Sequence, residues 1–237
     1  MLEGSGWYWS SLSQHASLFL CSRGVNLSLA GPKSSVRIRH AQSTTMLTIL
    51  FLAIANSGGP DSTCLSFLLN DTLRETKNAT QGEGWFGELI SLNVDHQFQS
   101  CSSEMSLETS KIAHRLGIPH ETLRIPWGSS PYSAKPSPGQ PIEHIARDAR
   151  YTLLLSGMRQ HGADVVAFGH HADDQLETFL MRLASGTGYL GLGGMKPVRR
   201  FGMGDGSPGQ MGWYGIDGMR RWVVRPLLGV PKVSCSS

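Results

Sequence analysis

The chain has 237 residues, which suits one α/β domain with appendages, and its 40% hydrophobic and 16% charged content is typical of a globular protein. A net charge of +3 is compatible with a nucleic-acid partner but too small to identify one. The longest apolar run, Met46 to Ala55, is about half of the ~20 residues that a membrane-spanning helix needs, so no membrane partner is expected.

Residues 1–45 differ in composition from the rest of the chain. They contain ten serines, four basic residues and one acid, Glu3. This composition is typical of an organellar transit peptide, and a disordered N-terminus is an equal alternative. The first reading places the protein in the mitochondrial matrix or another organelle, and the second in the cytoplasm. We expect the main domain over residues 46–231 and a short tail over 232–237.

From residue 46 onward, predicted strands and helices alternate. The apolar runs predict strands over 47–55, 89–94, 120–125, 164–168 and 222–224. Helical spacing predicts helices that begin at Asp61, cover 102–116 and 142–160, and run from about 171 to 184. Glycine, proline and polar residues predict loops over 78–87, 128–141 and 202–218. The alternation indicates an α/β fold, a doubly wound and mostly parallel Rossmann-like sheet, whose ligands bind beyond the carboxyl ends of the strands.

The segment Ser57 to Ser62, Ser-Gly-Gly-Pro-Asp-Ser, lies between the first predicted strand and the first helix. A strand, a glycine turn and a helix together present backbone N–H groups to an anion. Asp61 adds a carboxylate, which suits a phosphate site only if a divalent cation or a polarised hydroxyl lies between them. The segment lacks the lysine of a Walker-type loop. The alternative interpretation is an ordinary tight turn of small residues.

A second polar segment, His170 to Thr178, opens the helix that ends near residue 184. Asp174 and Glu177 share one helix face, and Asp173 suits the helix N-terminus as a cap. A solvated acidic first turn would explain the same residues. The apolar residues that follow are predicted to be buried in the core: Leu176, Phe179, Leu180 and Leu183.

Together these segments resemble a known family. Ser57–Ser62 is similar to the PP-loop of the N-type ATP pyrophosphatases. Residues 143–151, 169–178, 182–195 and 225–230, taken in this order, resemble motifs of the tRNA(Ile)-lysidine synthase family. The resemblance covers about residues 47–231 and implies an adenine nucleotide alpha hydrolase-like fold.

The resemblance implies two cofactors, ATP and Mg²⁺, and a set of site residues. The residues implied to bind the ATP phosphates are Ser57, Gly58, Gly59, Pro60, Asp61 and Ser62, with Asp61 also binding the metal. Asp174 and Glu177 are implied to position the amines of lysine and to deprotonate the attacking one. Arg147 is implied to lie near the reacting cytidine or nucleotide, and His170 either neutralises phosphate charge or orients Asp174. For Arg150, assistance in the site and simple pairing with acids remain equal alternatives.

The implied enzyme is a ligase that forms a carbon–nitrogen bond between free L-lysine and C2 of the wobble cytidine. Its implied partner is tRNA(Ile) with a CAU anticodon, and a homodimer is compatible with the resemblance. Two alternatives remain: a PP-loop tRNA thiolase, which the absence of a C-x-x-C pair disfavours, and a nucleotide-binding remnant without ligase activity. The remnant is suggested by Gln97-Phe98-Gln99, which stand after Asp95-His96 where the family usually has Gly-Leu-Arg.

Overall fold

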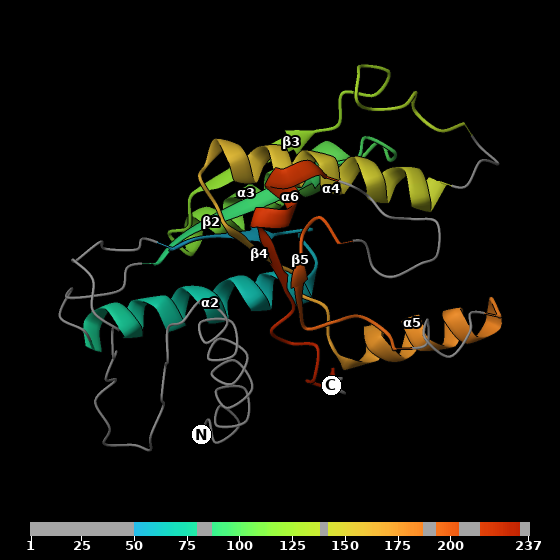
Figure 1. Cartoon of the computed structure of the whole chain (residues 1–237). Coiled ribbons are helices and arrows are strands. Elements are labelled where there is room, and N and C mark those ends of the chain that lie inside the picture. The colour runs from blue at the N-terminus through green and yellow to red at the C-terminus, as the bar shows by residue number, and fades with distance from the viewer. Residues whose placement is uncertain (1–49, 80–86, 138–141, 187–192, 204–213, 233–237) are drawn as a thin grey trace. The chain divides into compact units, whose positions relative to one another are not determined.

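The computed structural model describes residues 50–79, 87–137, 142–186, 193–203 and 214–232 (Figure 1). The predicted extension over 1–45 and all but the first residue of the predicted tail lie outside these ranges, as do parts of the predicted loops at 78–87, 128–141 and 202–218. The described residues form two compact units, a larger one over Thr48–Gly169 and Arg199–Val224, and a smaller one that includes His170–Val198 and the residues from Arg225. No described helix combines the length and apolar character needed to cross a bilayer.

A six-stranded sheet forms the centre of the larger unit. Its strands are β1 (Leu50–Ala55), β2 (Gly87–Asp95), β3 (His120–Arg124), β4 (Val165–Ala167), β5 (Val198–Arg200) and β6 (Trp222–Val224). They lie in the order β3-β2-β1-β4-β6-β5, and β1 pairs in parallel with both β2 and β4. The β2–β3 and β4–β6 pairs are also parallel. The predicted doubly wound, mostly parallel sheet is therefore confirmed.

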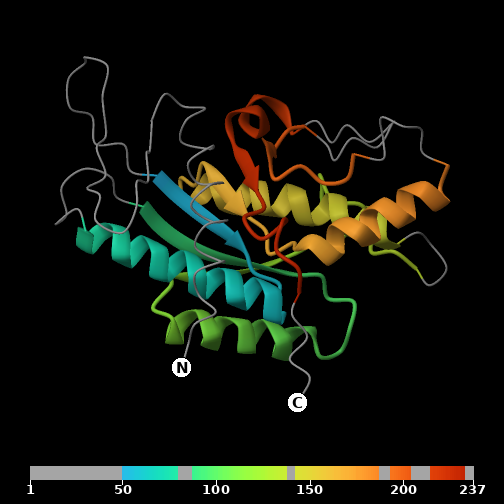
Figure 2. The same cartoon turned by 90° about the horizontal axis from the view of Figure 1, so that it is seen from below.

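Helices cover both faces of this sheet (Figure 2). The helices α2 (Pro60–Ala79) and α3 (Ser102–Arg115) lie on one face, and α4 (Ile142–Gln160) lies on the other. The main hydrophobic cluster forms between α4 and the sheet, and its largest members are Leu92, Tyr151, Leu154, Met158, Phe168 and Phe201. Because helices cover both sides of β2, polar residues from its middle to its carboxyl end are buried, namely Ser91, Asn93 and Asp95.

Two elements were not predicted. Strand β5 is only three residues long, and two of them are arginines. Helix α6 (Gly215–Arg220) lies partly inside the predicted loop over 202–218, so that prediction is wrong at its C-terminal end. The helix has six residues, of which two are glycines, and its sequence therefore carries almost no helical signal.

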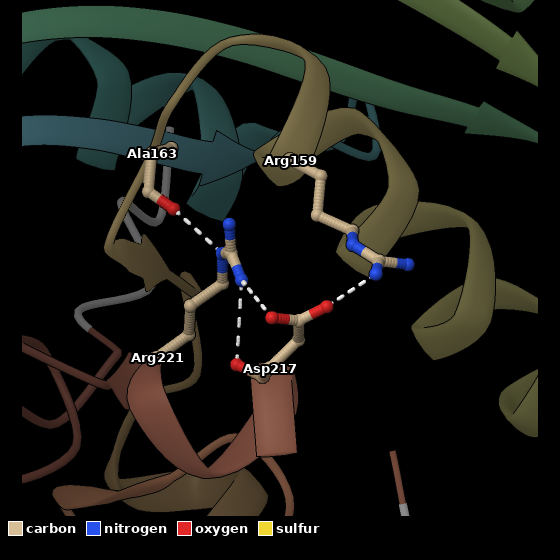
Figure 3. Close-up of polar contacts among 4 residues, drawn as sticks. All are labelled: Arg159, Ala163, Asp217 and Arg221. Carbon is tan, nitrogen blue, oxygen red and sulfur yellow. Dashed lines mark hydrogen bonds and ion pairs between the residues drawn. The ribbon is translucent and has the colours of Figure 1, made fainter. Parts of the chain in front are cut away.

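Ion pairs and hydrogen bonds stabilise α6 against α4 and the start of β4 (Figure 3). The carboxylate of Asp217 pairs with Arg159 of α4 and lies 3.9 Å from Nη1 of Arg221. Nε of Arg221 donates a 3.0 Å hydrogen bond to the carbonyl oxygen of Ala163, directly before β4. Tertiary contacts thus hold a helix that its sequence alone would not form.

The smaller unit contains α5 (Ala172–Ala184) and the segments around residues 193–198 and 225–232. The apolar side chains of α5 are 38–59% exposed, including Leu176, Phe179, Leu180 and Leu183. Its polar face is the half-buried one: Gln175 exchanges hydrogen bonds with the backbone of Met195 at 2.8 and 2.7 Å. The prediction that the four apolar residues lie in the core is therefore wrong, because the amphipathic helix packs on its polar side.

Candidate functional site

The Ser57–Ser62 segment forms the predicted strand–turn–helix unit. Strand β1 ends at Ala55, and α2 begins at Pro60, whose fixed φ suits the first helical position. Gly58 has φ of +81°, a conformation that residues with a side chain rarely adopt. The turn brings the N-terminus of a 20-residue helix to the carboxyl edge of the sheet. The first backbone N–H groups of a helix have no partner within the helix, so this end favours anions.

Two hydroxyls and one carboxylate surround this turn. The hydroxyl of Ser62 is buried, lying 3.1 Å from Oδ1 of Asn56 and 3.0 Å from the carbonyl of Gly59. The exposed Ser57 places its hydroxyl 3.2 Å from that of Ser62. Asp61 lies in the first turn of α2 and is half-buried. A ligand at the turn therefore meets Ser57 directly, while Ser62 contributes to the internal structure of the turn.

Close backbone approaches fix the position of the turn in the larger unit. A Cβ atom at Gly58 would lie 2.3 Å from Oγ1 of Thr109 on α3. A Cβ atom at Gly169, just after β4, would lie 3.0 Å from backbone atoms of Asp61 and Ser62. The residues after β1 and β4 thus meet at one edge of the sheet, as predicted for adjacent parallel strands.

Charged and aromatic side chains lie together at the carboxyl end of β2. Asp95 is buried, and its carboxylate accepts a 2.9 Å hydrogen bond from the backbone N–H of Gln97. Nε of Arg150 donates to Nε2 of His96 at 3.2 Å. Burial and the charge of Arg150 lower the pKa of His96 to about 4, although Asp95 opposes them. Pairing with acids was one of the two roles predicted for Arg150. Its hydrogen bond instead goes to a neutral histidine.

Arg147 extends from the first turns of α4. Its guanidinium forms an ion pair with Glu143 at 3.2 Å, and its side chain is 48% exposed. An exposed pair of this spacing stabilises a helix by only about 0.3–0.5 kcal/mol. The cost of exchanging Glu143 for a phosphate is therefore small.

In the smaller unit, the predicted acids lie at the start of α5. His171 is the N-cap: its Nδ1 accepts from the N–H of Asp173 at 3.2 Å, while Oδ2 of Asp174 accepts from the N–H of His171 at 2.8 Å. The sequence suggested Asp173 as the cap, but the N-cap residue is His171. Glu177 follows one turn later and is exposed.

His170 lies beside a buried arginine of the same unit. Nε of Arg225, which is 1% exposed, donates to Nδ1 of His170 at 3.3 Å, and its Nη1 donates to the carbonyl of Lys196 at 2.8 Å. Since Nδ1 of His170 accepts this bond, the proton of the neutral ring is on Nε2. Nε2 of His170 is therefore the ring atom that can donate a hydrogen bond.

The structure brings the predicted phosphate-binding residues together, but it leaves one part of the predicted site untested. Asp174, Glu177 and His170 belong to the smaller unit, so their proximity to the phosphate-binding turn stays a prediction. Sequence reasoning missed Asn56 and Thr109, which contact the turn directly. For Asn56 a signal existed, because a polar residue directly precedes the turn where a buried strand ends.

The donor atoms at the turn fit Mg²⁺ bound together with phosphates. Asp61 and the exposed hydroxyl of Ser57 offer oxygen atoms, which this hard cation prefers. Within the described ranges no three His, Cys, Asp or Glu side chains gather as a metal cluster. A single carboxylate with substrate phosphates and water is a usual way to bind Mg²⁺, so Asp61 is the residue that would hold it.

Comparisons with known proteins agree with this geometry. A family model described as a PP-loop domain matches residues 33–236. The tRNA(Ile)-lysidine synthase of Bradyrhizobium diazoefficiens is 37% identical over 181 residues, which are 76% of this chain and 41% of that protein. The tRNA(Ile)-lysidine synthase of Bacillus subtilis is 36% identical over 154 residues, which are 65% of this chain and 30% of that protein. The chain thus spans less than half the length of these relatives.

Among solved structures, the U34-tRNA thiolase NcsA from Methanococcus maripaludis, determined with its [4Fe-4S] cluster, is similar in fold. The TM-score is 0.54 at 17% identity, over 78% of this chain and 55% of that one. At this identity the likeness concerns the fold alone. Because the PP-loop model extends over most of the chain and the Ser57–Ser62 turn has the geometry of a phosphate-binding loop, the chain belongs to the PP-loop family.

Proposed function

We propose that this chain contains the catalytic centre of a ligase that attaches lysine to C2 of the wobble cytidine of tRNA(Ile) with a CAU anticodon. The observation that carries the proposal is the Ser57–Ser62 turn at the N-terminus of α2, in a chain 37% identical to a tRNA(Ile)-lysidine synthase. ATP activates the cytidine by adenylating its C2 oxygen, and pyrophosphate leaves. The amine of lysine then displaces AMP.

The phosphate-binding turn supports the first half-reaction. The backbone N–H groups at the start of α2 and the hydroxyl of Ser57 donate to the phosphate oxygens, and these preorganised donors stabilise the charge that develops on pyrophosphate. Asp61 would hold Mg²⁺, which would neutralise part of the phosphate charge. Arg147, in an exposed and weak ion pair, can exchange Glu143 for the nucleotide or the RNA.

The acids of α5 support the second half-reaction. Lysine is protonated at neutral pH, since its reference pKa is about 10.4, and it must lose a proton before attack. Asp174 and Glu177 lie one turn apart on α5, where two carboxylates can anchor the ammonium group and accept its proton. His170, whose Nδ1 accepts from Arg225, can donate from Nε2 to a phosphate oxygen or to Asp174.

Pyrophosphate release measured with tRNA(Ile), ATP and Mg²⁺, with and without lysine, tests the proposal. A ligase releases pyrophosphate with tRNA and forms a lysine-modified cytidine only when lysine is added. Asp61→Asn, which keeps the shape but removes the charge, should lower the rate by at least about 100-fold, a size typical for loss of a charge-stabilising group. A thiolase would modify the tRNA without lysine, and a nucleotide-binding remnant would bind ATP without turnover; either result rejects the proposal.

A further inference from the structure

One side chain in the larger unit links the phosphate-binding turn to the interior of the sheet. Asn56 is 2% exposed and directly precedes Ser57. Its Oδ1 accepts a 3.1 Å hydrogen bond from the backbone N–H of Gly58 and lies 3.1 Å from the hydroxyl of Ser62, so it contacts both ends of the turn. Its Nδ2 donates in the opposite direction, to Oγ of Ser91 on β2, at 3.1 Å.

The backbone of Asn56 is also fixed to β2. Its N–H donates to the carbonyl of Leu92 at 2.9 Å, and its carbonyl accepts from Nδ2 of Asn93 at 2.8 Å. Neither backbone group can shift without breaking a buried hydrogen bond. With the backbone fixed, the side-chain hydrogen bonds to Ser91, Gly58 and Ser62 hold the amide of Asn56 in one orientation.

The hydrogen bonds continue from Ser91 to a histidine on β3. Ser91 is fully buried, and its Oγ lies 3.0 Å from Nδ1 of His120. When the proton of the neutral imidazole is on Nε2, Nδ1 of His120 can accept the single proton of Ser91, while Oγ of Ser91 accepts from Asn56. Nε2 then donates to Oγ1 of Thr122 at 3.1 Å. In this arrangement, which requires a neutral His120, every donor in the chain from His120 to the turn has an acceptor.

We propose that Asn56 is a positioning residue for ATP binding in this loop, and that Ser91 couples its orientation to the protonation state of His120. Asn56 touches no reacting atom and acts through Gly58 and Ser62. The inference deepens the proposed function because it assigns a regulator to the same phosphate site. It needs only ATP binding by the loop, and not the identity of the group that is activated.

The direction of the pH dependence follows from the hydrogen bonds. A protonated His120 would direct an Nδ1–H at Ser91, and the hydroxyl proton of Ser91 would then need a new acceptor in a site without water access. The charged groups around His120 are His114 on α3 and Glu121 beside it on β3, and β2 contributes Ser91. Burial first, and then His114, lowers the pKa of His120 from its ordinary value of 6.5, while Glu121 opposes them. His120 is thus neutral at pH 7, and acidification through its lowered pKa should weaken the hydrogen bonds that position the loop.

Equilibrium dialysis with radiolabelled ATP and Mg²⁺ at pH 7.5 tests the positioning role. Asn56→Ala removes both contacts of Oδ1 with the turn, and at about 1 kcal/mol each this should weaken ATP binding by roughly 10- to 30-fold. Asn70→Ala is the matched control, since it removes the 2.8 Å bond of a half-buried amide to the carbonyl of Leu116, further along α2 than the turn. The control should bind ATP as the unaltered protein does. Equal ATP affinity of Asn56→Ala and Asn70→Ala would overturn the inference.

Ser91→Ala tests the coupling to His120 and also serves if Asn56→Ala fails to fold. This substitution keeps the Oδ1 of Asn56 available to Gly58 and Ser62, but it removes the acceptor of Nδ2 and with it the connection to the histidine. The affinity of the unaltered protein for ATP should fall more steeply than that of Ser91→Ala as the pH is lowered from 7.5 to the lowest value at which both proteins stay folded, because only the unaltered protein connects the loop to the titration of His120. The titration of ATP itself is common to both. Parallel pH profiles would reject the coupling.

The two proposals fail in different ways. If the unaltered protein binds ATP but forms no lysine-modified cytidine, the ligase function is rejected and the role of Asn56 is still measurable. If lysine transfer is observed and Asn56→Ala binds ATP normally, the positioning role is rejected and the ligase function stands.

Discussion

Gly58 combines two constraints that can be separated by experiment. Its φ of +81° would strain any residue with a Cβ atom, which costs about 1–2 kcal/mol. Its missing Cβ would also lie 2.3 Å from Oγ1 of Thr109, and relief of such a contact by local shifts costs about 1–3 kcal/mol. Gly58→Ala should therefore destabilise the protein by about 2–5 kcal/mol or displace the loop at a similar energetic cost.

Gly128 provides a matched control. Its φ is +80°, yet a Cβ atom there would meet nothing within 4 Å. Gly128→Ala should show only the backbone strain, about 1–2 kcal/mol. The difference between the free energies of unfolding of the two variants, measured by urea unfolding, gives the steric contribution to the destabilisation of Gly58→Ala.

A double-mutant cycle assigns that part to Thr109. Thr109→Ala removes Oγ1 and loses its 2.8 Å bond to the carbonyl of Met105, at a cost of about 1 kcal/mol. In the double variant the clash is gone, so the coupling free energy should be about 1–3 kcal/mol in favour of stability. ATP binding should recover in parallel. If Gly58→Ala costs no more than Gly128→Ala, and no coupling to Thr109 appears, the packing of α3 against the turn is refuted.

Three further predictions concern other parts of the chain. Asp174→Asn retains an oxygen that can accept from the N–H of His171, so it should leave the helix cap and ATP binding intact while it lowers lysine transfer at least about 100-fold; an equal loss of ATP affinity would place Asp174 in the nucleotide site instead. His96 has a folded-state pKa of about 4, below its ordinary 6.5, so the unfolded state binds more protons between these values; stability should fall as the pH drops from 6.5 to 4, and urea unfolding of His96→Gln should show a smaller fall. Asp217→Asn leaves Arg159 and Arg221 facing each other without a carboxylate, and calorimetry should show a melting temperature lower by about 2–6 °C, with an unchanged value contradicting the anchoring of α6.

Local patterns were sufficient to predict β1, the phosphate-binding turn and α2. An apolar run, two glycines and a polar helix start follow one another within about a dozen residues, and each signal depends on its neighbours in sequence. The bounds of α4 and β6 were predicted to the residue for a similar reason, since proline or glycine and charged residues flank their apolar cores.

Contacts between distant residues could not be predicted in the same way. Asn56, Ser91 and His120 meet only because the register pairs Ser91 with His120 across β2 and β3, and no local pattern carries that register. The buried face of α5 was misassigned because periodicity identifies an apolar face but not the partner that covers it. Strand β5 and helix α6 are too short for periodicity to detect.

The exposed apolar residues of α5 affect how every solution experiment on this chain must be run. Leu176, Leu180 and Leu183 are each more than half exposed and recur at helical spacing, so they form one continuous hydrophobic strip on the helix surface. Such strips adhere to each other, to plastic and to hydrophobic chromatography media, and more strongly as sulfate or phosphate is added. Melting temperatures will then vary with protein concentration, and calorimetry and urea titrations are best made dilute, in chloride buffers, at several concentrations.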